Sequence, residues 1–141
     1  MPTEAAAKNT VLIVDDSPDG LHLLNEVLKR QYNVRLARSG EQALREALQK
    51  PRPDAILLDI MMPGMDGYEV CSRLKANDAT RDIPVIFITA KTDIDDAQRG
   101  FDLGGADYIS KPILTPVVLA RISTHIALKL AREFMKGKTW V

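Results

Sequence analysis

Residues 55–67 have the sequence Ala-Ile-Leu-Leu-Asp-Ile-Met-Met-Pro-Gly-Met-Asp-Gly. The stretch begins as a short apolar run, and this run ends at Asp59. A continuous apolar run of this length, without alternation, is typical of a strand that is covered on both faces. The Pro- and Gly-containing segment after it indicates a loop, and a helix is expected from about Tyr68 to Ala76. The stretch therefore predicts a buried strand, a tight acidic loop and a helix in succession.

The same strand and helix unit recurs on both sides of this stretch. Further apolar runs predict strands at residues 11–14, 33–37, 84–88 and 106–110. Amphipathic segments predict helices that begin after Ser17-Pro18, at Ser39 with Gln42 as a capping box, at Thr92 with an end near Gly100, and at Thr115 with an end near Phe134. Alternating strands and helices of this kind predict a parallel sheet with helices on both faces.

Composition limits the classes of function that need to be considered. The chain has 141 residues, of which 45% are hydrophobic and 27% charged, as expected of one globular domain. Its net charge is zero, so the chain as a whole offers no basic surface for nucleic acid or an anionic membrane. No apolar run approaches the roughly 18 residues that span a bilayer. The single cysteine, Cys71, excludes an internal disulfide and favours a cytoplasmic location, and we expect it to be partly buried.

Polar side chains come directly after four of the predicted strands. The first strand leads to Asp15 and Asp16, the third to Asp59, the fourth to Thr89 and the fifth to Lys111. Each alone is most simply a turn residue, a helix cap or a solvated loop charge. Ligands of open parallel sheets bind beyond the carboxyl ends of the strands, so the five residues are expected to share one edge. Clustered carboxylates attract a hard cation such as Mg²⁺, and a carboxylate can also form an aspartyl phosphate.

Four segments together resemble the receiver domains of two-component response regulators. They are residues 11–17 (VLIVDDS), 57–67 (LLDIMMPGMDG), 86–90 (IFITA) and 104–112 (GGADYISKP). The resemblance covers about residues 10–132, with residues 1–9 as an N-terminal tail and 133–141 as a tail or the start of a linker. It implies a flavodoxin-like α/β fold, with five βα units and a doubly wound parallel sheet of strand order 2-1-3-4-5.

The resemblance also implies roles for the acidic residues. Asp59 corresponds to the phosphorylated aspartate of the family. Asp15, Asp16 and Asp59 are expected to hold Mg²⁺, or Mn²⁺ in its place, together with the backbone carbonyl of Met61. Gly64 and Gly67 are expected to let the loop after Asp59 fold tightly beside the metal.

A second group of residues is implied to sense the phosphoryl group. Thr89 corresponds to the switch hydroxyl, Ala90 to its neighbour at the phosphate, and Lys111 to the lysine that pairs with the phosphoryl group. Tyr108 corresponds to the aromatic residue that turns inward when Thr89 moves. Pro112 resembles the cis proline of the family.

The expected function is that of a signalling phosphoacceptor, not an enzyme acting on a separate substrate. The phosphoryl donor would be a phosphohistidine of a sensor histidine kinase or of a histidine phosphotransfer protein. The surface formed by the fourth helix, fifth strand and last helix would control a partner, and the last helix would reach an output module or a second copy. A flavin-binding protein of the same architecture would need a hydroxyl- and Gly-rich loop where Asp15 and Asp16 stand. A phosphatase of the haloacid dehalogenase type would need a DxD pattern there, which residues 15–18 lack.

Overall fold

The computed structural model of the chain describes residues 8–90 and 94–136. In these residues five parallel strands form one sheet in the order β2-β1-β3-β4-β5. The strands are β1 (Thr10–Val14), β2 (Asn33–Ala37), β3 (Ala55–Leu58), β4 (Val85–Thr89) and β5 (Asp107–Ser110). The helices are α2 (Pro18–Leu28), α3 (Gly40–Leu48), α4 (Gly67–Ala76), α5 (Ile94–Asp102) and α6 (Thr115–Lys136). The predicted flavodoxin-like fold and strand order are confirmed.

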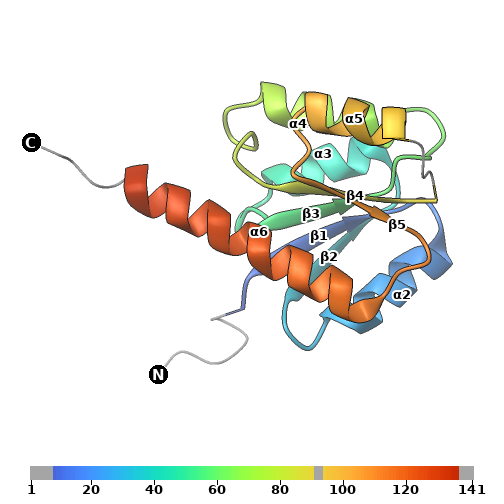
Figure 1. The fold of residues 1–141 in the computed structure, drawn as a ribbon, viewed down its shortest axis with the longest axis horizontal. Helices are drawn as coiled ribbons and strands as arrows, with labels where there is room; N and C mark the ends of the chain where they lie inside the picture. The colour runs from blue at the N-terminus through green and yellow to red at the C-terminus, as the bar shows by residue number, and fades with distance from the viewer. Residues whose placement is uncertain (1–7, 91–93, 137–141) are drawn as a thin grey trace, which may run out of the picture.

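The helices form two layers, one on each face of the sheet. Helices α2 and α6 cover one face, and α3, α4 and α5 cover the other (Figure 1). Successive side chains of β1 pack alternately against the two helix layers, because the side chains of a strand alternate between its faces. Val11 and Ile13 pack with α2 and α6, whereas Leu12 and Val14 pack with α3 and α4. All four side chains are buried, which explains why this strand has no polar alternation.

The helix starts match the predicted capping with one difference. The Ser17 hydroxyl accepts a hydrogen bond from the Gly20 backbone N–H at 3.3 Å and begins α2. The Ser39 hydroxyl accepts from the Gln42 N–H at 3.1 Å and begins α3. The Gln42 side chain, however, accepts from the N–H of Arg38 at 2.8 Å and not from that of Ser39. The reciprocal half of the predicted capping box is therefore displaced by one residue.

Several element boundaries differ from the predicted ones by one or two residues. Strand β5 begins at Asp107, because the preceding residues turn at Gly104, whose φ is +102°. Helix α5 continues to Asp102, and α6 continues to Lys136. The expected cap at Thr92, like the tails at 1–7 and 137–141, lies outside the described residues. Cys71 is completely buried, so the expectation of partial burial was wrong.

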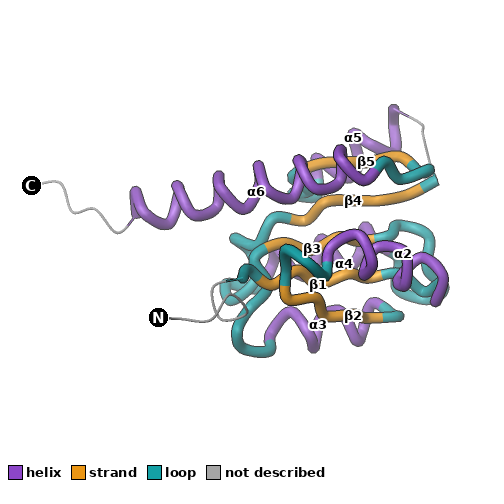
Figure 2. The backbone as a smooth tube through the Cα atoms, turned by 90° about the horizontal axis from the view of Figure 1, so that it is seen from below, coloured by secondary structure: helices purple, strands orange, loops and turns teal. Residues whose placement is uncertain are grey.

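No helix within residues 8–90 and 94–136 combines the length and the apolar character needed to cross a membrane. The sheet brings the carboxyl ends of β1, β3 and β4 side by side at one edge, where the polar residues lie. In Figure 2 the end of α6 lies well beyond the opposite edge of the sheet.

Candidate functional site

The end of β1 holds Asp15 in a fixed position. Its backbone N–H donates to the Ala37 carbonyl of β2 at 3.1 Å. Its carboxylate accepts a hydrogen bond from the Ser17 N–H at 2.9 Å, and the side chain is buried. A β-carbon at Gly20 would lie 2.9 Å from the Asp15 carboxyl carbon, so the first turn of α2 can approach this closely only with glycine there. Asp16, the next residue, is half-buried.

The end of β3 delivers Asp59 directly beside Asp15. The Asp59 N–H donates to the Val14 carbonyl at 2.9 Å, and its carboxylate accepts from the Met61 N–H at 3.2 Å. The loop after it closes when the Gly67 N–H donates to the Ile60 carbonyl at 2.9 Å.

The two glycines of this loop have different structural roles. Gly64 has a φ of +74°, which favours glycine. A β-carbon at Gly67 would lie 2.7 Å from the Ile60 α-carbon and closer still to the Asp59 carbonyl oxygen. The expected tight turn is confirmed at both positions, through backbone angle at Gly64 and close approach at Gly67.

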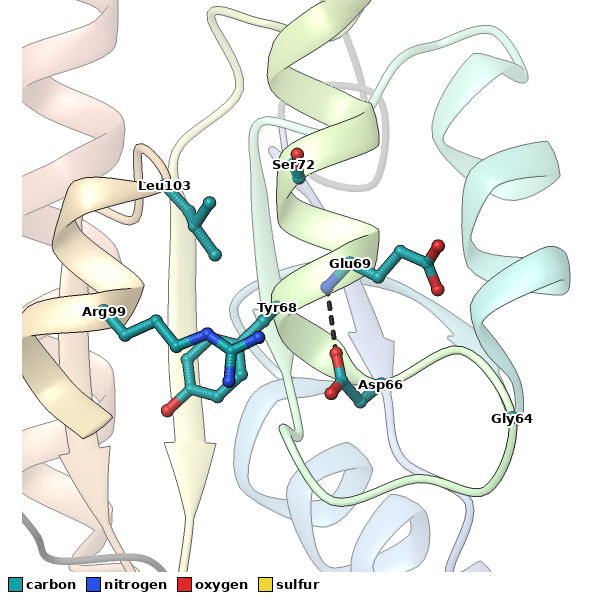
Figure 3. Close-up of a pocket in the computed structure, with 7 residues that line it drawn as sticks. All are labelled: Gly64, Asp66, Tyr68, Glu69, Ser72, Arg99 and Leu103. Atoms are coloured by element: carbon teal, nitrogen blue, oxygen red, sulfur yellow. Dashed lines mark hydrogen bonds between the residues drawn. The ribbon is translucent and has the colours of Figure 1, made fainter. Parts of the chain in front are cut away.

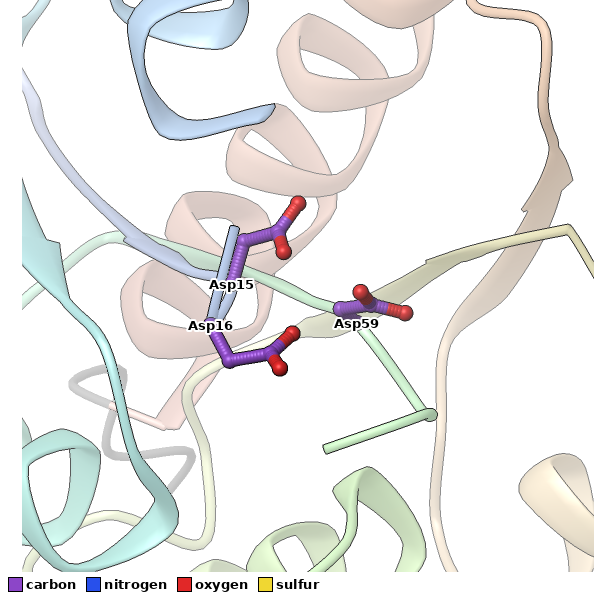
Figure 4. Close-up of side chains that lie close together, drawn as sticks. All are labelled: Asp15, Asp16 and Asp59. Atoms are coloured by element: carbon purple, nitrogen blue, oxygen red, sulfur yellow. The ribbon is translucent and has the colours of Figure 1, made fainter. Parts of the chain in front are cut away.

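The three predicted carboxylates gather in one cluster. Figure 4 shows Asp15, Asp16 and Asp59 beyond the ends of β1 and β3, and each offers an oxygen within 4.8 Å of the other two. Burial raises the pKa of Asp59 to about 6, the positive charge of Lys111 opposes this rise, and the negative charge of Asp15 adds to it. The site therefore holds negative charge that the protein compensates only in part. Three oxygen donors with excess negative charge suit a hard divalent cation.

Lys111 lies between two of these carboxylates. Its ammonium nitrogen is 3.6 Å from Asp15 Oδ2 and 3.7 Å from Asp59 Oδ2. Its backbone N–H donates to the Thr89 carbonyl at 2.8 Å, which fixes the loop after β5 to the end of β4. The Lys111–Pro112 peptide bond is cis, as expected from the resemblance.

Thr89 and Ala90 stand at the end of β4, next to β3 in the sheet. Thr89 is fully buried, and Ala90 directly after it is exposed. The carboxyl end of the strand therefore places a hydroxyl-bearing residue and an exposed backbone turn at the same edge as Asp59. The structure brings Asp15, Asp16, Asp59, Thr89 and Lys111 to one edge, as predicted.

Tyr108 lies on β5 and away from the carboxylate cluster. It is the register partner of Phe87 on β4, and the two ring centroids are 6.4 Å apart. The ring is partly buried against the layer of α3 and α4. Tyr108 therefore lies beside β4, the strand that ends at Thr89.

An ion-pair group next to Tyr108 was not expected from the sequence. The Asp107 carboxylate accepts from Arg121 at 2.7 Å and lies 2.9 Å from His125 Nε2. Burial alone would raise the pKa of Asp107, but hydrogen bonds from Arg121, His125 and the Tyr108 N–H together hold it below its ordinary value. The sequence indicates only a helix-face residue at His125, because spacing along one helix does not show which strand lies opposite.

A second unexpected feature joins the first turn of α4 to α5. The Tyr68 hydroxyl donates to the Asp96 carbonyl at 2.8 Å, and the Arg99 guanidinium lies 4.3 Å above the Tyr68 ring. Burial raises the pKa of Tyr68 to about 12. Tyr68 and Arg99 line a groove of about 400 Å³ between α4 and α5 (Figure 3). The only signal in the sequence was that Tyr68 directly follows Gly67 at the end of the loop.

Proteins of known identity are similar in sequence to this chain. A protein of Vibrio cholerae named as a probable cyclic di-GMP phosphodiesterase is 43% identical over 135 residues, which are 96% of this chain and 30% of that protein. The response regulator PleD of Caulobacter vibrioides is 41% identical over 129 residues, 91% of this chain and 28% of PleD. The chain thus spans less than a third of the length of these two relatives.

Solved structures agree with the sequence relatives. The receiver domain of a signal transduction histidine kinase from Syntrophus aciditrophicus is 36% identical with a TM-score of 0.76, covering 84% of this chain and 90% of that one. The chemotaxis protein CheY4 of Vibrio cholerae is 29% identical with a TM-score of 0.78, covering 83% of this chain and 98% of that one. The family model of the response regulator receiver domain matches residues 11–123. This chain therefore belongs to the receiver domain family of two-component response regulators.

Proposed function

We propose that Asp59 is the phosphoacceptor of this receiver domain. The observation that carries the proposal is the cluster itself: the Asp59 carboxylate lies with those of Asp15 and Asp16 and within 3.7 Å of the Lys111 ammonium. A phosphoryl group at this point would meet a cation site on one side and a lysine on the other. Both are needed to offset the charge that a phosphoryl group carries.

The chemical step is a transfer between two nucleophiles. An Asp59 carboxylate oxygen attacks the phosphorus atom of a phosphohistidine, a P–O bond forms, and the P–N bond breaks with its electron pair returning to the imidazole. The donor belongs to a sensor histidine kinase or a histidine phosphotransfer protein. Beyond accepting and losing this group, the domain has no proposed enzymatic activity of its own.

The acidic cluster is the proposed binding site for Mg²⁺, or Mn²⁺ in its place. The donor set is all oxygen: carboxylates of Asp15, Asp16 and Asp59, with the backbone carbonyl of Met61. When bound, the cation supplies positive charge to the phosphoryl oxygens. The pKa of Asp59 is raised first by burial and then by the negative charge of Asp15, and a bound cation would offset the cost of both.

Four further residues, Lys111, Thr89, Ala90 and Tyr108, are proposed to respond to the phosphoryl group on Asp59. Lys111 exchanges its present contacts with Asp15 and Asp59 for the phosphoryl oxygens, and the Thr89 hydroxyl donates to them, with Ala90 moving in the same turn. Charge-assisted contacts of roughly 1–3 kcal/mol each bias an equilibrium between two loop arrangements. Tyr108 moves inward after Thr89 and changes the surface formed by α5, β5 and α6.

The bounds and the cellular location of the domain are also proposals. The receiver domain is proposed to span residues 10–132 and to act in the cytoplasm, where its phosphoryl donor would reach it. The output is proposed to lie in a module joined through residues 133–141 or in a separate partner. Because the Vibrio cholerae relative is named as a cyclic di-GMP phosphodiesterase, an output acting on that nucleotide is one such module. A flavin is not proposed, since its phosphate would face three carboxylates.

The test is phosphorylation by a small acyl phosphate with Mg²⁺, read by intact mass. The wild type is expected to gain the mass of one phosphoryl group, and Asp59→Asn is expected to gain none. Asp19→Asn serves as the control, because Asp19 is an exposed acid in the first turn of α2. Equal labelling of Asp59→Asn and wild type would refute Asp59 as the acceptor.

A further inference from the structure

Helix α5 is held to the domain by little apolar packing. Within residues 95–102, Gly100 alone is buried, and a glycine has no side chain to add to the core. Phe101, the large apolar residue next to it, is 44% exposed. A helix with so few buried side chains belongs to the part of a fold that opens most readily. The position of α5 therefore depends on other contacts.

Tyr68 of α4 provides two of these contacts. Its hydroxyl donates to the backbone carbonyl of Asp96, in the first turn of α5, at 2.8 Å. The guanidinium of Arg99, about one turn further along α5, lies 4.3 Å from the centre of the Tyr68 ring. Figure 3 shows the Arg99 and Tyr68 side chains meeting from the two helices. The Tyr68 side chain thus holds α5 at two successive points.

Tyr68 is itself fixed beside the loop that follows Asp59. Its side chain is 2% exposed, and its ring centroid lies 5.7 Å from that of Phe87 on β4. The residue before it, Gly67, closes the loop by donating its backbone N–H to the Ile60 carbonyl at 2.9 Å. Because the ring is enclosed by the core, it cannot follow a displacement of α5.

We propose that Tyr68 is a positioning residue that holds α5 in its resting place and so opposes the response of the domain to phosphorylation. The inference rests on the proposed function, in which Thr89 and Ala90 move with the phosphoryl group. Helix α5 begins at Ile94, shortly after Ala90, so a movement of that turn displaces the first turn of α5. A displacement of roughly 1 Å takes the bond from Tyr68 to Asp96 out of hydrogen-bonding range. The resting arrangement has this bond, and the responding arrangement lacks it.

The size of the effect follows from the two contacts. The net contribution of one neutral hydrogen bond corresponds to a factor of about two to ten in an equilibrium constant. A cation–aromatic contact at a partly exposed site corresponds to a factor of about two to five. Removing either contact should shift the resting equilibrium toward the responding arrangement by that factor. The apparent affinity for a phosphoryl group rises in proportion to the population of that arrangement.

The first experiment measures the affinity for beryllofluoride with Mg²⁺, a stand-in for the phosphoryl group, by fluorine NMR. Tyr68→Phe keeps the ring and loses the hydroxyl, so it should bind about two- to tenfold more tightly than the wild type. Arg99→Gln should bind about two- to fivefold more tightly. Tyr32→Phe is the matched control, because Tyr32 is also nearly buried, at 9% exposed, but packs in the layer of α2 and α6 on the other face of the sheet. Its affinity should equal that of the wild type.

The sign of the change separates this role from a merely structural one. A tyrosine that only supported the fold would leave the affinity unchanged or lower it when shortened. Binding by the wild type without a gain in Tyr68→Phe would therefore refute the proposed role of Tyr68 and leave the phosphoacceptor site standing. A wild type that bound no beryllofluoride would instead refute the proposed function, and the coupling of Tyr68 to it as well.

The second experiment needs neither metal nor phosphoryl group. Hydrogen exchange of the α5 amides, followed by mass spectrometry, should be about two- to tenfold faster in Tyr68→Phe than in the wild type, because α5 opens more readily without the bond. Exchange in α2 should be the same in both proteins, and urea unfolding verifies that each variant is folded. Unchanged exchange in α5 would show that Tyr68 does not hold this helix, and it would overturn the proposal whatever the outcome at Asp59.

Discussion

Neutralising Asp59 should stabilise the metal-free protein. The Asp59 side chain is 10% exposed, and its pKa is raised from 3.8 to about 6, mainly by burial. A shift of about 2 units corresponds to about 3 kcal/mol of unfavourable free energy when the carboxylate is ionised in the folded state. Asn removes that charge and retains an oxygen that can accept from the Met61 N–H. Loss of the Lys111 contact offsets part of the gain, so we expect Asp59→Asn to be more stable by about 1–3 kcal/mol.

The pH dependence has a definite sign. An acid whose pKa is higher in the folded state takes up a proton on folding between the two pKa values. Wild-type stability should therefore rise as the pH falls from above 6 toward 3.8, and the Asn variant lacks this component. The difference between the two proteins is expected to be full above pH 6 and to vanish near pH 4.

Urea unfolding in the presence of a chelator measures this difference directly. Urea unfolding curves at neutral pH and near pH 4 compare the wild type, Asp59→Asn and the exposed control Asp19→Asn. Adding Mg²⁺ should then stabilise the wild type more than Asp59→Asn, since binding to the folded state alone raises stability by mass action. If Asp59→Asn were equal to or less stable than the wild type at neutral pH without metal, the charge argument would be wrong.

Three further tests address other parts of the structure. Gly67→Ala should destabilise the domain by about 1–3 kcal/mol and slow phosphorylation, because its β-carbon would meet the Asp59 carbonyl. Gly64→Ala introduces only backbone strain and should slow phosphorylation less; urea unfolding measures the stability of each variant, and intact mass measures its phosphorylation. Asp107→Asn should lower stability at neutral pH, and this difference should disappear as the pH falls below the ordinary aspartate pKa of about 3.9, because the pKa of Asp107 is depressed in the folded protein; acid titration of both proteins would show it. Cys71 should resist a thiol reagent at neutral pH in the native protein and react in urea, since burial raises its pKa to about 11; rapid native labelling would contradict this.

The parallel sheet with helices on both faces and the carboxylate edge could be predicted from local order along the chain, whereas the strand order 2-1-3-4-5 was implied only by the resemblance to receiver domains. Apolar runs that end at an acid, a threonine or a lysine place those residues at one edge once the strands are parallel. The continuous apolar run at 55–58 predicts a strand covered on both faces, and all four residues are buried, whereas the outer strands β2 and β5 are only partly buried. The site could therefore be predicted from the residues directly after each strand.

Contacts that depend on which elements face each other could not be predicted in the same way. Asp107 and His125 are 18 residues apart, and nothing in their spacing shows that β5 lies against that turn of α6. The hydrogen bond from the Tyr68 hydroxyl to the Asp96 carbonyl could not be predicted either, because every residue has a backbone carbonyl and the sequence does not show which one accepts. The Gln42 side chain accepts from the Arg38 N–H, and the residue types alone do not show which backbone N–H it would reach.

The position of Lys111 has a consequence for how the resting site is charged. Its ammonium lies within 3.7 Å of both Asp15 and Asp59, so it would compete with the proposed divalent cation for their oxygens. In the proposed mechanism a phosphoryl group on Asp59 would draw the amine away and leave these oxygens to the cation. The proposed metal binding and phosphorylation would thereby be coupled through Lys111. A substitution that removes the amine would then tighten metal binding and also remove the proposed contact of Lys111 with the phosphoryl group.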